Sequence, residues 1–113
     1  MHELSLCMSI AELVQEHAQR AGVSRVTRVV VEIGMAAPVD PQALQFSFPV
    51  VTAQTSMQGA ALDIRRVPLR LRCKVCGLES EPVAPHDPCT ACGAFQREVL
   101  AGREMRVLSI VGE

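Results

Sequence analysis

The chain has 113 residues and a formal net charge of -1, and 49% of its residues are hydrophobic whereas 20% are charged. This length is sufficient for one ordinary domain or two very small ones, and the apolar content argues against intrinsic disorder. Three Phe with no Trp or Tyr provide no aromatic platform for single-stranded nucleic acid. A duplex-DNA binder usually has a far more basic balance, and no apolar run approaches the ~20 residues of a bilayer span.

The first element that the sequence predicts is an amphipathic helix over residues 4–21. Apolar residues recur there at spacings of three and four, which places them on one face of a helix. Gly22 follows in the position of a left-handed cap, so the helix is expected to end there. The predicted buried face consists of Leu6, Ile10, Leu13, Val14, His17 and Ala21.

The second predicted element is a strand over residues 25–33, a stretch rich in Val. Val29, Val31 and Ile33 alternate and therefore share one face of the strand. Val26 falls out of register with them, which leaves two alternatives open: a bulge, or a second buried face.

A second helix is expected to begin at Asp40 and Pro41, because an acceptor at the N-cap followed by Pro at the first helical position is a strong start signal. Pro49 lies inside the helical pattern and removes the hydrogen bond to the carbonyl of Gln45. We therefore expect a kink or an early end at Pro49. Residues 61–67 then predict a short strand.

Residues 69–96 differ in character, since they contain four cysteines, three of the seven prolines and few residues large enough to form a core. A last strand is predicted over residues 104–111. The simplest arrangement is an α+β fold in which two helices pack on a three-stranded mixed sheet, with a zinc-ribbon-like module inserted before the last strand. The predicted domains are 1–68 plus 97–113, and the inserted 69–96.

The cysteines of the insert follow a C-x2-C, x12, C-x2-C pattern and are Cys73, Cys76, Cys89 and Cys92. Two intervening residues let one tight turn present both sulfurs to one metal, and Gly77 and Gly93 allow the positive φ that such a turn needs. Four thiolates around one ion suit structural Zn(II), which would supply much of the folding free energy of the insert. Rubredoxin-like iron, two disulfides or a redox-active pair are the alternatives.

The chain start offers a second group of metal ligands. The α-amine of Met1, the amide nitrogen of His2 and the His2 imidazole can close fused chelate rings around one ion, and the carboxylate or the amide of Glu3 can complete a planar set. Square-planar nitrogen and oxygen ligands favour Ni(II) or Cu(II). The alternative is that His2 is a solvated terminal residue and that Glu3 only stabilises a helix N-terminus.

The opening Met1-His2-Glu3-Leu4-Ser5-Leu6, combined with the two C-x2-C pairs, resembles the HypA/HybF family of nickel metallochaperones in [NiFe]-hydrogenase maturation. The resemblance covers nearly the whole chain. It implies Ni(II) as transferred cargo at Met1 (through its amine), His2 and Glu3, and structural Zn(II) at the four cysteines. It also implies a HypB-type partner GTPase that helps to deliver nickel to the hydrogenase large subunit, and a protein that is not an enzyme.

Three further expectations accompany this interpretation. The protein is predicted to be cytoplasmic, because five cysteines follow an N-terminus without a basic signal region. It is predicted to act as a monomer or homodimer, without nucleic-acid or membrane partners. Cys7 is interpreted as a half-buried apolar residue and His86 as an exposed loop residue, with a role as auxiliary nickel ligand left open for both.

A zinc-ribbon nucleic-acid-binding or adaptor module is the rival interpretation. It would use a run of basic side chains that otherwise forms a solvated surface or a docking face for an acidic partner: Arg65, Arg66, Arg70, Arg72 and Lys74. The rival does not explain the Met-His-Glu start. It is also disfavoured by the low net charge and the scarcity of aromatic residues.

Overall fold

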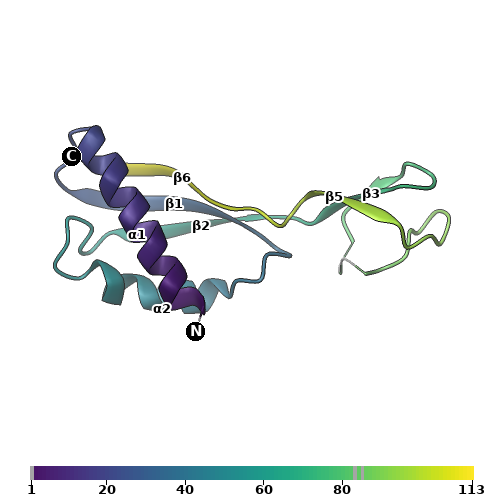
Figure 1. Cartoon of the computed structure of the whole chain (residues 1–113), viewed down its shortest axis with the longest axis horizontal. Helices are drawn as coiled ribbons and strands as arrows, with labels where there is room; N and C mark the ends of the chain where they lie inside the picture. Colours follow the sequence, from purple (N-terminus) through teal and green to yellow (C-terminus); the bar gives the residue numbers. More distant parts are fainter. Residues whose placement is uncertain (1, 83, 85) are drawn as a thin grey trace. The chain divides into compact units, whose positions relative to one another are not determined.

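The computed structural model describes residues 2–82, 84 and 86–113, and within them the chain forms two helices and six strands (Figure 1). In chain order the elements are α1 (His2–Arg20), β1 (Val26–Gly34), α2 (Pro41–Thr52), β2 (Ala61–Val67), β3 (Arg70–Cys73), β4 (Glu79–Ser80), β5 (Arg97–Ala101) and β6 (Met105–Gly112). The strands form two three-stranded sheets, in the orders β2-β1-β6 and β4-β3-β5.

The chain divides into two compact units. The first comprises Met1–Glu32, Val39–Arg65 and Arg106–Glu113, and the second comprises Ile33–Pro38 and Arg66–Met105. The second unit therefore extends beyond residues 69–96 on both sides, and it includes β5, whose residues were assigned to the other domain from the sequence.

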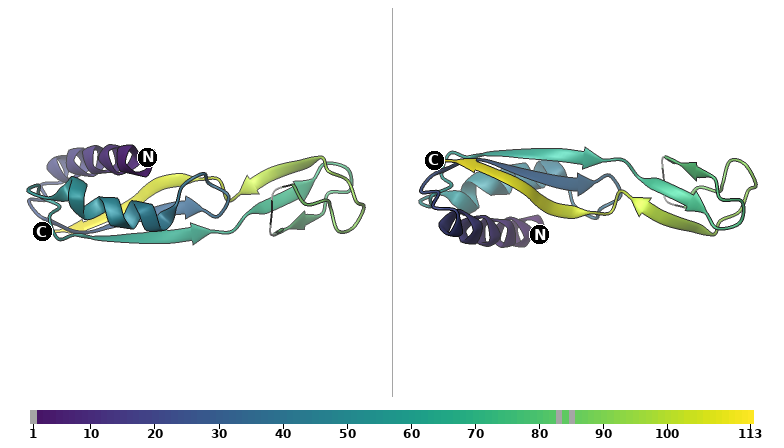
Figure 2. Two further views of the ribbon diagram at one scale, coloured as in Figure 1. Left: turned by 90° about the horizontal axis from the view of Figure 1, so that it is seen from below. Right: turned by 90° about the horizontal axis from the view of Figure 1, so that it is seen from above.

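The sheet of β2, β1 and β6 is mixed, as the sequence predicted. Strands β1 and β2 run in the same direction and β6 runs against them (Figure 1). Arg25 and Glu113 exchange both backbone hydrogen bonds where β1 begins and β6 ends, at 3.0 and 2.9 Å. The parallel pair is connected through α2, and both helices lie on the same face of the sheet (Figure 2).

Central strand β1 is buried mainly on the face that packs against the helices. Val29, Val31 and Ile33 are each at most 1% exposed, which confirms the predicted face. Val26 and Val30 on the opposite face are also buried, whereas Arg28 between them is exposed and Glu32 is half-buried. The second buried face that the sequence left open is therefore present only in part.

Helix α1 buries a different face from the one predicted. Ile10 and Val14 are buried as expected, whereas Leu13 and Ala21 are exposed. His17 is also exposed, so its predicted place on the buried face is wrong. The buried face is completed by the small residues Cys7, Ala11 and Ala18. Small side chains let the helix approach its neighbours closely. A prediction based on the spacing of large apolar residues does not identify this contact.

Helix α2 begins as the sequence predicted. Asp40 has the extended backbone of an N-cap, and its Oδ1 accepts hydrogen bonds from the amides of Gln42 and Ala43 at 3.0 and 3.4 Å. The helix continues through Pro49 to Thr52, so the early end does not occur. Leu44 and Phe48 are buried, and this burial offsets the hydrogen bond that Pro49 removes.

The paired Phe residues of α2 provide a test of this core. Phe48 is 1% exposed and Phe46 is 83% exposed on the same helix. We expect Phe48→Ala to lower the free energy of unfolding by about 3–5 kcal/mol, because it leaves a cavity. Phe46→Ala, the matched control, is expected to change it by less than about 0.5 kcal/mol. Urea titration of the zinc-loaded protein, followed by helical circular dichroism, measures both; equal losses would contradict the assignment.

Candidate metal centres

The four predicted zinc ligands meet at one point of the second unit. Their sulfur atoms all lie within 4.8 Å of one another. The Sγ atoms of Cys73 and Cys92 are 3.6 Å apart, as are those of Cys76 and Cys89. A regular tetrahedron with Zn–S bonds of about 2.3 Å has S–S edges of about 3.8 Å. The donor set and its spacing therefore fit a tetrahedral zinc ion.

Two similar turns build this arrangement. After Cys73 at the end of β3, the amide of Gly77 donates to the Cys73 carbonyl at 2.9 Å; after Cys89, the amide of Gly93 donates to the Cys89 carbonyl at 2.8 Å. Gly77 and Gly93 have φ values of 81° and 77°, which L-residues rarely adopt. The predicted requirement for glycine after each pair is thus confirmed.

The electrostatics of the cluster favour a bound cation. A hydrogen bond from the Cys76 amide lowers the pKa of Cys73 to about 6, and one from the Cys92 amide lowers the pKa of Cys89. The pKa of Cys92 is raised to about 11: the Ala94 amide lowers it, but the neighbouring thiols and desolvation raise it more. Four thiols this close cannot all ionise alone, whereas a divalent cation stabilises all four thiolates together.

The disulfide alternative does not fit this geometry. All four cysteines are free thiols, and their closest sulfur pairs at 3.6 Å are far longer than a disulfide bond of about 2.05 Å. Cys73 and Cys89 are buried, whereas Cys76 and Cys92 are exposed.

An arginine that the sequence analysis did not single out supports the loop before the second cysteine pair. Arg97 on β5 donates to the Asp87 carbonyl at 2.9 Å and to Ser80 Oγ at 2.8 Å. It thereby ties the segment leading into Cys89 to strand β4. His86, in the same loop, is exposed. No local signal marks Arg97, because its partners are distant in the sequence.

The second group of predicted ligands lies at the start of α1. Met1 is outside the described residues, whereas His2 and Glu3 form the first turn of the helix. The His2 side chain is 60% exposed, and its Nδ1 lies 3.8 Å from Glu3 Oε2. The first amides of a helix have no intrahelical acceptor. The imidazole is thus accessible to an ion, and the first amides have no acceptor inside the helix.

Asp40, identified from the sequence only as a helix cap, is a neighbour of this site. Its backbone amide donates a hydrogen bond to Glu3 Oε2 at 3.2 Å. This bond lowers the pKa of the Glu3 carboxyl and attaches the first turn of α1 to the start of α2. Positions 3 and 40 are too far apart in the sequence for any local pattern to pair them.

Cys7 is completely buried and its thiol donates to the Leu44 carbonyl at 3.3 Å. Burial raises the pKa of this thiol. Both features oppose a role as nickel ligand, since the thiolate is the form that binds metal. Cys7 is more deeply buried than the half-buried position expected from the sequence.

Three of the four arginines in the basic run are paired with acidic neighbours. Arg72 lies opposite Glu79 on β4 and Glu98 on β5, with ion-pair distances of 4.0 and 3.9 Å. Arg70 pairs with the same Glu79 at 3.1 Å. Arg65 likewise pairs with Asp63, and Arg66 donates to the carbonyls of Ile33 and Gly34. Guanidinium groups so engaged do not form a free phosphate-binding surface.

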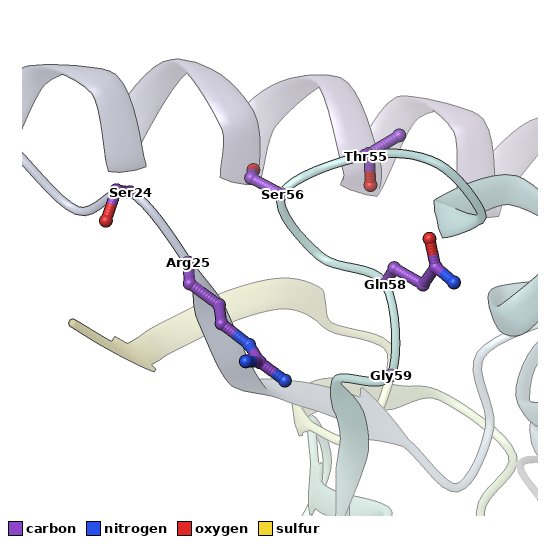
Figure 3. A pocket seen from close by; sticks show the side chains of 6 residues that line it. All are labelled: Ser24, Arg25, Thr55, Ser56, Gln58 and Gly59. Carbon is purple, nitrogen blue, oxygen red and sulfur yellow. The ribbon is translucent and has the colours of Figure 1, made fainter.

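A polar hollow of about 560 Å³ in the first unit is formed by Ser24, Arg25, Thr55, Ser56, Gln58 and Gly59 (Figure 3). Gln58 turns away from Arg25 in this view, and the side chains do not converge on a common point. The hollow therefore lacks the convergent polar groups of a ligand site. No helix among residues 2–82, 84 and 86–113 has the length and apolar character to cross a membrane.

The α+β fold and the four-thiol cluster define a small metal-binding protein with a zinc-ribbon-like unit. Residues 1–112 match the family described as "Hydrogenase/urease nickel incorporation, metallochaperone, hypA", and the chain belongs to this family. The family consists of nickel metallochaperones of hydrogenase maturation, which are not enzymes. This outcome confirms the resemblance seen in the sequence.

Relatives align with the chain along its length. Hydrogenase maturation factor HypA of Acidithiobacillus ferrooxidans is 42% identical over 107 residues, covering 95% of each chain. Hydrogenase maturation factor HybF of Klebsiella pneumoniae is 39% identical over 113 residues, covering 100% of each. The solution structure of the Ni metallochaperone HypA from Helicobacter pylori superposes with a TM-score of 0.68 at 29% identity, covering 97% of this chain and 96% of that one.

The fifth cysteine provides a matched control for the cluster. We expect Cys73→Ala to lose its zinc and to unfold the second unit, because three thiolates leave one coordination position open and weaken the ion that holds the unit together. Cys7→Ala is expected to keep one zinc per chain. Metal analysis after gel filtration and X-ray absorption at the zinc edge measure the outcome; a wild-type spectrum with fewer than four sulfur ligands would contradict the assignment.

Proposed function

We propose that the chain binds one Ni(II) at its N-terminus and, with a HypB-type GTPase, delivers it to the large subunit of a [NiFe]-hydrogenase. The nickel ligands in this proposal are the Met1 amine and groups of His2 and Glu3. Structural Zn(II) is held by Cys73, Cys76, Cys89 and Cys92. The cytoplasm is the proposed location, because reduced thiols are required for this zinc site.

The observation that carries the nickel site is that helix α1 begins at His2. The amides of the first helical turn have no intrahelical acceptor, so deprotonating them breaks no hydrogen bond of the helix. The negative charges of deprotonated nitrogen ligands offset the positive charge of the bound ion. The complex is therefore not repelled by the positive end of the helix dipole. An exposed imidazole beside amides that the helix leaves without an acceptor is the donor set that planar Ni(II) prefers.

We further propose that Glu3 contributes its amide nitrogen rather than its carboxylate. The carboxylate accepts the hydrogen bond from Asp40, and ligation would require it to give up part of this contact. In this arrangement the carboxylate positions the first turn of α1 while the backbone binds the ion. The delivery partners rest on the maturation role of the family, in which the named relatives are hydrogenase maturation factors.

The nickel site is tested by comparing His2→Ala with His17→Ala, because both histidines are exposed and lie on α1. We expect His2→Ala to abolish Ni(II) binding and His17→Ala to retain it, with zinc content unchanged in both. One extra residue before Met1 is expected to be nearly as damaging as His2→Ala, because it moves the amine out of the chelate.

Calorimetric titration of the zinc-loaded protein with Ni(II) measures these affinities. Binding should weaken on acidification in the wild type, because the amine and the imidazole must lose protons before they coordinate. An extended protein that binds Ni(II) with unchanged affinity would show that the ligands lie elsewhere.

Glu3→Gln separates the two roles of Glu3. The Gln side-chain oxygen can still accept a hydrogen bond from the Asp40 amide. The substitution nevertheless removes the negatively charged carboxylate that could bind nickel. If the backbone amide binds nickel, the affinity should stay within about threefold of the wild type, a change of well under 1 kcal/mol. A loss of more than about 100-fold, nearly 3 kcal/mol, would identify the carboxylate as a ligand. The same titration measures this variant.

A further inference from the structure

Two of the four cysteines in the zinc cluster lie at the surface of the second unit. Cys76 and Cys92 are exposed, whereas Cys73 and Cys89 are buried. Each turn therefore presents its second cysteine to solvent and covers its first. Oxidation of a cysteine requires an accessible thiolate, and a bound zinc ion keeps all four sulfurs in the thiolate form. The two exposed cysteines meet both conditions.

Hydrogen bonds shield the buried sulfurs further. Those of Cys73 and Cys89 each accept hydrogen bonds from two backbone amides of their own turn, whereas the sulfur of Cys92 accepts one, from the Ala94 amide. Such hydrogen bonds stabilise the negative charge on sulfur, and a thiolate stabilised in this way is a weaker nucleophile. Burial and hydrogen bonding therefore both direct an oxidant to the exposed cysteines first.

The closest sulfur contacts in the cluster cross from one turn to the other. Cys76 Sγ lies 3.6 Å from Cys89 Sγ, and Cys92 Sγ lies 3.6 Å from Cys73 Sγ. Each contact joins one exposed cysteine to one buried cysteine. A disulfide bond of about 2.05 Å would form if the two sulfurs of a contact approached each other by about 1.5 Å. The cluster thus contains two pairs in which a reactive thiolate lies next to a resolving thiolate.

We propose that the zinc cluster is a modification site for hydroperoxides, with oxidation beginning at Cys76 or Cys92. The products are two cross-turn disulfides, which join Cys76 to Cys89 and Cys92 to Cys73. This inference rests on the zinc site proposed above and goes beyond it, because it concerns a chemical reaction of the zinc ligands. The nickel ligands take no part in it.

Each disulfide forms in two balanced steps. The exposed thiolate attacks one oxygen of hydrogen peroxide and breaks the O–O bond, which gives a sulfenic acid and a hydroxide ion. The neighbouring thiolate then attacks the sulfur of the sulfenic acid, forms the S–S bond and displaces a second hydroxide ion. The two sulfurs lose two electrons in total and the peroxide gains them. Two protons from the solvent convert both hydroxide ions into water.

The cross-turn pairing has a structural consequence. One disulfide leaves two thiolates and the second leaves none, so the zinc ion is released. Each disulfide joins the turn after β3 to the turn before β5, which is the connection that the ion makes in the reduced protein. A covalent link of this kind also lowers the entropy of the unfolded chain. We therefore expect the oxidised, zinc-free second unit to remain folded, whereas the reduced, zinc-free unit unfolds.

Hydrogen peroxide added to the zinc-loaded protein tests this site. A zinc-responsive dye should report one ion released per chain, and metal analysis beforehand verifies that the cluster was loaded. Limited proteolysis then compares two zinc-free forms. The oxidised protein should keep its second unit resistant to cleavage, whereas the protein treated with chelator and reductant should lose this resistance. Reductant and added zinc should restore the starting form.

Peptide mapping identifies the bonds that form. Trypsin cleaves after Lys74 and so separates Cys73 from Cys76, and tandem mass spectrometry distinguishes Cys89 from Cys92. Both cross-turn disulfides are expected, so that each links the first turn to the second. Disulfides within a single turn would overturn the proposal.

The fifth cysteine is an internal control. Cys7 is completely buried, so it should remain a free thiol while the cluster is oxidised, and Cys7→Ala should give the same two disulfides. A Cys7 that reacts before the cluster, a cluster that keeps its zinc in peroxide, or an oxidised second unit that unfolds would each contradict the inference. A protein isolated without zinc would overturn the zinc assignment itself, and this inference with it.

Discussion

The attraction between four clustered thiolates and a divalent cation is the interaction on which the second unit depends. Few of its described side chains are deeply buried. They include Leu69, Leu71 and two of the zinc-cluster residues, Cys73 and Cys89. So small a core cannot offset the conformational entropy lost on folding. The metal must supply the difference. The sulfur atoms are then held at tetrahedral spacing by strands β3 and β5 and by the two glycine turns. The metal site and the fold of the second unit therefore form together.

The first unit is stabilised differently, by a valine-rich central strand under two helices. This rigid support matters for the chain start, because α1 is fixed by the burial of Cys7, Ile10 and Val14 while its first turn remains open. The hydrogen bond between Glu3 and the Asp40 amide joins that turn to α2. A metallochaperone must release its cargo, and ligands on one exposed helix end meet that need better than a closed cage.

Ion pairs between adjacent strands engage the arginines of the basic run. Arg70 and Arg72 of β3 pair with Glu79 and Glu98, which lowers the positive potential that a nucleic-acid-binding zinc ribbon requires. The outer strand β6 of the other sheet, by contrast, has neither charge nor proline along residues 107–112.

The sequence by itself determined the elements with strong periodicity or punctuation. It predicted β1 from its valines, the start of α2 from Asp40 and Pro41, and the four-cysteine pattern, since each depends on neighbours along the chain. Tertiary structure decided the rest. It selected the small-residue face of α1 and left His17 exposed, formed the short strands β3 and β5, paired Glu3 with Asp40, and paired three arginines of the basic run with acidic residues. These features depend on residues brought together by packing, and local spacing carries no information about such distant contacts.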